Sequence, residues 1–179
     1  EGETLVTSIL DGLVRYKDRI DAHHVMVLYY KIGCLYFGMG DNKGCIEYLQ
    51  KIIHNKSLKM REDLLCFSRV LSLVAHYEAG LDYHLETQLK ETYKFLIKMN
   101  DLHAVQREMI KFLKNLGDIY PSQIKTEFKK LYTRLKQYEE HPYEKRAFLY
   151  LDILSWLESN IEERPVADII KEKAKTLKP

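Results

Sequence analysis

Residues 29–57, YYKIGCLYFGMGDNKGCIEYLQKIIHNKS, hold the most informative pattern in this chain. Tyr29, Ile32 and Tyr36 recur at the spacing of one helical face. Gly33 lies next to that face and has no side chain to hold a neighbouring helix away. We therefore expect two antiparallel helices that approach closely at Gly33. Another kind of helical hairpin with a glycine at its crossing would satisfy the same pattern.

The spacing resembles the tetratricopeptide repeat signature, W-x2-L-G-x2-Y followed by A-x3-F and a closing Pro. Gly33 and Tyr36 match it outright. The other signature positions are substituted, with Tyr29 for Trp, Ile32 for Leu, Cys45 for Ala, Leu49 for Phe and Ser57 for Pro. The resemblance is clear for one repeat at about 26–59 and degenerate after it. It implies an all-α fold, a right-handed superhelical stack of antiparallel helix hairpins that forms a tetratricopeptide-like α-solenoid.

Three glycines, Gly40, Gly80 and Gly117, recur at intervals of roughly 40 residues, which is an internal repeat period. Gly40 with Asp41 ends one helix and caps the next. About eight or nine helices are expected: an orphan helix over 4–20, pairs over 22–57, 60–99 and 102–140, and capping helices over 142–179. The pairs consist of helices at 22–39 and 42–54, at 60–79 and 83–98, and at 102–116 and 121–139.

The apolar pattern also predicts which side chains are buried. In the second pair, Leu85, Leu89, Tyr93 and Leu96 are spaced by three or four and are expected in the core. From Pro142 to about 160 a single helix is expected, apolar on nearly all sides, and a short basic helix starts at Pro165. We expect one helical repeat domain over 1–179.

Composition narrows the class of protein. The chain has 179 residues, 46% of them hydrophobic and 30% charged, and a formal net charge of +2, which is ordinary for a water-soluble protein. No apolar run reaches membrane-spanning length. Three cysteines without framework spacing indicate reduced thiols and a cytoplasmic protein. The chain begins without Met, and an unpaired helix comes first, so we expect the C-terminal fragment of a longer protein.

Residue types that support catalysis or metal binding do not form any known pattern. The chain has no Gly-rich phosphate loop, no G-x-S-x-G and no H-E-x-x-H. The seven histidines lack an i, i+4 pair, and the neighbours His23 and His24 point about 100° apart on a helix. We therefore expect no enzyme activity, no metal and no cofactor.

A row of basic residues is the best candidate for a binding site. Arg107, Lys111 and Lys114 share one helical face, and residues 105–136 hold eight Lys or Arg against three Asp or Glu. In tetratricopeptide proteins the first helix of each pair lines a concave groove, so the resemblance implies a groove for a peptide or protein, here an acidic one. The full set of candidate partner-binding residues is Tyr30, Arg69, His76, Tyr77, Arg107, Lys111 and Lys114. A solvated helix face is the alternative for the basic row.

These observations predict a protein–protein interaction module or scaffold that binds a peptide or protein partner in the groove. A peptide- or ligand-sensing regulatory domain that controls an upstream effector domain, for example a DNA-binding one, is the alternative. RNA binding would need a basic groove across several repeats. Because the basic excess is confined to one region, no nucleic acid is expected.

Overall fold

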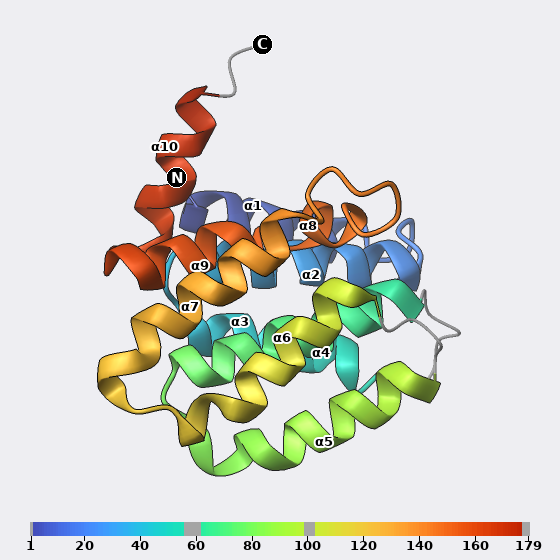
Figure 1. Ribbon diagram of the computed structural model, residues 1–179. Helices are drawn as coiled ribbons and strands as arrows, with labels where there is room; N and C mark the ends of the chain where they lie inside the picture. The colour runs from blue at the N-terminus through green and yellow to red at the C-terminus, as the bar shows by residue number, and fades with distance from the viewer. Residues whose placement is uncertain (1, 56–61, 99–102, 177–179) are drawn as a thin grey trace. The chain divides into compact units, whose positions relative to one another are not determined.

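Every regular element of the structure is a helix. The computed structural model describes residues 2–55, 62–98 and 103–176, and these ranges contain no strand (Figure 1). The chain divides into two compact units, Glu1–Asp82 and Tyr83–Pro179, called unit 1 and unit 2 below. The all-α class expected from the sequence is confirmed, while the right-handed stack stays a prediction.

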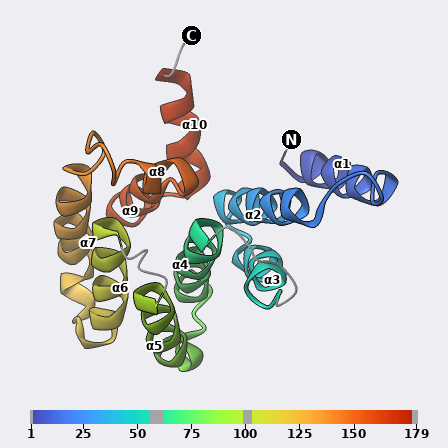
Figure 2. The same ribbon diagram turned by 90° about the vertical axis from the view of Figure 1, so that its right-hand side faces the viewer.

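Unit 1 consists of helices that pack mainly on their neighbours in sequence. It contains α1 (Gly2–Arg15), α2 (Ala22–Gly38), α3 (Asn42–Ile53) and α4 (Glu62–Glu78). In Figure 2, α2 and α3 lie side by side as a hairpin, and α4 packs on both of them. The hairpin predicted over residues 22–54 is therefore present. The helix expected over 4–20 ends earlier, at Arg15.

Local turn chemistry sets the limits of these helices. The Asp21 carboxylate caps α2 by accepting hydrogen bonds from two backbone N–H groups, at 2.9 and 3.0 Å. Asp41 caps α3 in the same way, accepting from the N–H of Gly44 at 2.9 Å. Gly40 and Gly80 have φ of +81° and +66°, the left-handed conformation in which helices commonly end. Both turns predicted from these glycines are present.

The signature glycine lies where α2 crosses α3. A Cβ atom placed on Gly33 would be 3.2 Å from Cδ2 of Leu49 and 3.7 Å from the carbonyl oxygen of Cys45. Gly33, Cys45 and Leu49 are all buried. The close approach inferred from the sequence is therefore a feature of the structure.

Unit 2 contains five α-helices of two or more turns, one short helix and a 3-10 turn. They are α5 (Asp82–Lys98), which begins at the unit boundary, α6 (Ala104–Asn115), η1 (Leu116–Asp118), α7 (Pro121–Lys136), α8 (Arg146–Tyr150), α9 (Ile153–Glu162) and α10 (Val166–Thr176). In this unit α6 packs on α7, α7 on α9 and α9 on α10. Three aromatic rings join α6, α7 and α9. The ring centroid of Phe128 lies 4.9 Å from that of Phe112 and 5.4 Å from that of Trp156.

The single helix expected from Pro142 to about 160 is wrong. The chain forms α8, becomes extended at Leu151 (φ −139°, ψ 120°), and starts α9 at Ile153. Asp152 causes the restart, because its carboxylate accepts from the Ser155 N–H at 3.1 Å and from the Ser155 hydroxyl at 2.6 Å. The described ranges hold ten α-helices rather than eight or nine, and this break contributes one of them.

The start of α6 is capped from a distant part of the chain. Glu144, in the turn before α8, accepts hydrogen bonds from the backbone N–H groups of Ala104 at 3.0 Å and Val105 at 3.2 Å. Its side chain is only 13% exposed. Gln106 adds a local cap by accepting from the His103 N–H at 3.0 Å. A negative group at a helix N-terminus also interacts favourably with the helix dipole.

We expect Glu144→Ala to lower the free energy of unfolding by about 1–2 kcal/mol, because two helix-start N–H groups lose their acceptor. Glu144→Gln keeps one carbonyl oxygen and should lose less. Glu140 is exposed and lies in the same connection between α7 and α8, so Glu140→Ala serves as the matched control. The measurement is urea unfolding followed by circular dichroism. Equal midpoints for Glu144→Ala and the control would show that the cap contributes nothing.

Candidate functional site

The basic row predicted on residues 107–114 lies on the exposed side of α6. The side chains of Arg107, Lys111 and Lys114 are exposed at i, i+4 and i+7. The opposite side of the helix is buried, through Val105, Gln106, Met109, Ile110, Phe112 and Leu113. Packing of the apolar side therefore orients α6 and presents the three cations to solvent.

Most neighbouring cations of unit 2 are neutralised by carboxylates. Arg134 pairs with Glu108 at 2.9 Å, and further ion pairs are Lys125–Glu163 at 2.9 Å, Lys130–Glu127 at 2.6 Å and Lys136–Glu139 at 2.7 Å. Within the described part of the chain, no carboxylate lies within ion-pair distance of Lys111 or Lys114. Lys114 acts on Glu86 only from further away: the pKa of Glu86 is lowered chiefly by its hydrogen bond to Lys90, with a smaller contribution from Lys114.

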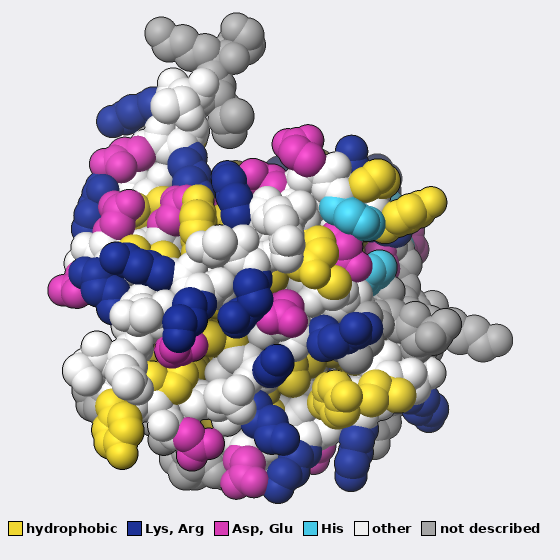
Figure 3. Space-filling view, viewed as in Figure 1, with side chains coloured by type: hydrophobic (Ala, Val, Ile, Leu, Met, Phe, Trp, Pro, Cys, Tyr) yellow, Lys and Arg dark blue, Asp and Glu magenta, His cyan; other side chains and the backbone are white. Residues whose placement is uncertain are grey.

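Exposed apolar groups also lie on α5. Tyr93 is 44% exposed and Ile97 is 53% exposed. The prediction that Tyr93 belongs to the core is wrong, because the structure buries Thr92 in its place, 3% exposed. Thr92 and Tyr93 both follow Leu89 at helical spacing. The buried side of α5, however, consists of Leu85, Leu89, Thr92 and Leu96. In Figure 3, Lys and Arg side chains gather over α5 and α6, and hydrophobic side chains lie exposed among them.

The other predicted site residues belong to unit 1 and are less accessible. Tyr30 on α2 is 4% exposed, and His76 on α4 is 7% exposed. The Nδ1 of His76 lies 2.7 Å from the carbonyl oxygen of Ser72, one turn earlier in α4, so the ring is fixed against the backbone of its own helix. Arg69 and Tyr77 are half-buried. A partner cannot reach Tyr30 or His76 unless unit 1 opens locally.

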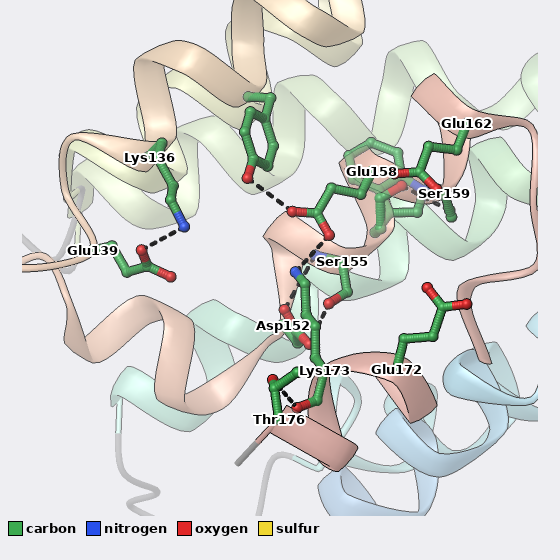
Figure 4. Close-up of polar contacts among 12 residues, drawn as sticks. Lys136, Glu139, Asp152, Ser155, Glu158, Ser159, Glu162, Glu172, Lys173 and Thr176 are labelled. Atoms are coloured by element: carbon green, nitrogen blue, oxygen red, sulfur yellow. Dashed lines mark hydrogen bonds and ion pairs between the residues drawn. The ribbon is translucent and has the colours of Figure 1, made fainter. Parts of the chain in front are cut away.

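Glu158 joins three helices of unit 2, which is a structural role. Its oxygens accept from the hydroxyl of Tyr132 on α7 at 2.8 Å and pair with Lys173 on α10 at 2.6 Å (Figure 4). Burial and the hydrogen bond to Glu158 raise the pKa of Tyr132. This network ties α9 to two other helices. The sequence shows no signal for it, because its three residues come from separate helices.

Two glutamates near helix ends are held in ion pairs, and burial disfavours the thiolate form of two cysteines. Glu139 and Glu162 lie in ion pairs near helix ends, with Lys136 at 2.7 Å and Arg164 at 3.0 Å. All three cysteines are thiols. Burial raises the pKa of the Cys34 thiol to about 11 and raises that of Cys45 still further, which disfavours their reactive thiolates. Among the described residues, no group of three or more His, Cys, Asp or Glu is arranged to hold a metal ion.

Comparisons with known proteins leave the chain without a match: no protein-family model, no curated protein sequence and no solved structure matches it. No helix among the described residues has the length and apolar character needed to cross a membrane. The basic row of α6, with the exposed part of α5 beside it, is therefore the candidate site with the clearest geometry.

Proposed function

We propose that this protein is an interaction module of the tetratricopeptide type that binds an acidic peptide or protein surface through α6. The close crossing of α2 and α3 at Gly33 supports the repeat assignment, because this contact is the reason for the glycine in the signature. The proposal includes the right-handed stacking of hairpins that the resemblance implies. It places the partner on α6, the first helix of the third predicted hairpin.

One observation carries the proposal: Lys111 and Lys114 project from an ordered helix and have no carboxylate at ion-pair distance in the described chain, whereas Lys125, Lys130 and Lys136 do. A row of cations at helical spacing fits carboxylates that are spaced along a peptide. Charge-assisted hydrogen bonds to such carboxylates are stronger than neutral ones. Affinity should therefore fall as salt is added.

We expect Arg107→Gln, Lys111→Gln and Lys114→Gln, made together, to weaken binding of a polyglutamate peptide by about tenfold or more, equivalent to roughly 1.4 kcal/mol. Stability should change by less than about 1 kcal/mol, because exposed charges on a helix contribute little to it. Binding is measured by fluorescence anisotropy at two salt concentrations, and stability by thermal melting.

The matched control replaces Lys125, Lys130 and Lys136 with Gln, which removes the same charge from cations that already have carboxylate partners. If both triple variants lose affinity equally, only net charge matters and α6 is a solvated face. If the α6 triple variant melts far below the wild type, the row carries structure and the binding assignment to α6 fails.

A further inference from the structure

The surface beside the basic row has an apolar centre. On α5, Glu86, Lys90, Tyr93 and Ile97 follow one another at i, i+4, i+7 and i+11, which places them along one side of the helix. Tyr93 and Ile97 are about half exposed, whereas Leu89 and Leu96, on the buried side of the same helix, are 6% and 0% exposed. Two adjacent apolar side chains are thus presented to solvent on this helix.

The two rows run along adjacent helices. Figures 1 and 2 both show α5 and α6 side by side in unit 2, running in opposite directions. This arrangement agrees with the small contribution of Lys114 to the lowered pKa of Glu86. Lys111 and Arg107 then follow α6 in the direction in which α5 proceeds to Tyr93 and Ile97.

Exposed cations lie on both helices. Lys90, Lys94 and Lys98 are exposed on α5, and Lys111 and Lys114 are exposed on α6. Lys90 is paired with Glu86 at 2.6 Å. Lys94, Lys98, Lys111 and Lys114 make no ion pair with any residue in the described ranges. The surface formed by Tyr93 and Ile97 together with these lysines is called the α5–α6 surface below.

We propose that the α5–α6 surface binds an acidic amphipathic segment of a partner protein, whose apolar side chains cover Tyr93 and Ile97 while its carboxylates pair with the surrounding lysines. This inference rests on the proposed function and extends it, because an acidic character alone would leave the apolar centre uncovered. Interface cores are typically apolar and aromatic with a polar rim, which is the arrangement found here.

Other classes of partner fit the surface less well. A single-stranded nucleic acid would need several aromatic rings on which successive bases stack, and the surface offers Tyr93 alone. Ile97 has no planar face for a base. An anionic membrane surface would be opposed by the exposed carboxylate of Glu91 on the same helix, which has no ion pair among the described residues. An acidic segment that ends short of Glu91 avoids that repulsion.

The test compares two synthetic peptides with the same negative charge. The amphipathic peptide has Leu spaced by three and four residues among Glu and Ala, and the polar peptide has Ser in place of every Leu. The protein is used as the full chain, and affinity is measured by calorimetry. We expect the amphipathic peptide to bind about tenfold more tightly than the polar one.

Variants assign this difference to the surface. Tyr93→Ser with Ile97→Ser should remove the preference for the amphipathic peptide and leave binding of the polar peptide unchanged. Lys111→Gln with Lys114→Gln should weaken binding of both peptides. Tyr143→Ser with Leu149→Ser is the matched control, since these side chains are 78% and 83% exposed elsewhere in unit 2. Circular dichroism confirms that each variant is folded.

The outcomes separate the two proposals. Equal affinity of both peptides, with dependence on Lys111 and Lys114, would overturn the amphipathic inference and keep the proposed function. If the amphipathic peptide binds more tightly but its affinity is unchanged by the substitutions of Lys111 and Lys114, the proposed function is overturned. Absence of binding by either peptide would overturn both proposals. Tighter binding to phosphatidylserine vesicles or to polyuridylate, lost in the Tyr93 and Ile97 variant, would show that the partner class is wrong.

Discussion

Replacing Trp156 with Ala is expected to lower the free energy of unfolding by about 3–5 kcal/mol, the range typical of a large buried aromatic side chain. Trp156 is 2% exposed, and its ring packs edge-on against Phe128 at 5.4 Å between centroids. Phe128 in turn contacts Phe112. Removal of the indole therefore leaves a cavity at the junction of α6, α7 and α9.

Urea unfolding monitored by circular dichroism gives the measurement, because Trp156 is the only tryptophan and its loss removes the fluorescence signal. Leu149→Ala, on a side chain that is 83% exposed, is the control and should shift the midpoint little. If Trp156→Ala lowers the free energy of unfolding by less than about 1 kcal/mol, either unit 2 repacks around the missing ring or the three aromatic rings do not form its core.

Replacing Gly33 with Leu is expected to destabilise unit 1 by about 1–3 kcal/mol through overpacking. The added Cβ would already lie 3.2 Å from Cδ2 of Leu49, and the remaining side-chain atoms have no space between α2 and α3. The gain in helix propensity over Gly, at most about 1 kcal/mol, does not offset this strain. Thermal and urea unfolding of the variant measure the effect.

A second glycine isolates the contribution of propensity. Gly12 also lies within a helix, but nothing is within 4 Å of a Cβ placed there. Gly12→Leu should therefore stabilise α1 by up to about 1 kcal/mol, in the direction opposite to Gly33→Leu. If the two variants unfold at the same urea concentration, the crossing at Gly33 does not constrain the fold.

Local signals explain why the order of the helices could be predicted. Gly40 and Gly80 end helices through their own conformation, and Asp21 and Asp41 cap them through bonds to residues two or three positions later. Such signals lie within a few residues of one another and are readable without a structure. The helices at 22–38 and 42–53 were therefore predicted almost to the residue.

The break between α8 and α9 was missed although its signal is also local. The apolar residues on both sides of Asp152 have the density of a single buried helix, and this pattern outweighed the capping sequence from Asp152 to Ser155. The prediction that Tyr93 lies in the core failed for a similar reason. Thr92 and Tyr93 lie three and four residues after Leu89, so spacing alone cannot decide between them, and hydrophobicity favoured the residue that is in fact exposed.

The basic row was predictable from charge and spacing, whereas its surroundings were not. The sequence shows that Arg107, Lys111 and Lys114 share a face, but it does not show which lysines have carboxylate partners. Arg134 forms an ion pair with Glu108 on another helix, and Lys125 pairs with Glu163, which is 38 residues away in the sequence. Only the packing of the helices distinguishes these paired cations from Lys111 and Lys114.

The cap that Glu144 places on α6 restricts how this chain can change in length. Its carboxylate binds amides that lie 40 and 39 residues earlier, so the turn after α7 and the start of α6 must stay together. Arrays of helical repeats commonly gain or lose whole repeats during evolution, because each repeat contacts only its neighbours. A hairpin inserted between α7 and Glu144 would carry the carboxylate away from α6. A change in length between α7 and Glu144 is therefore expected to remove the stability that this cap contributes to α6.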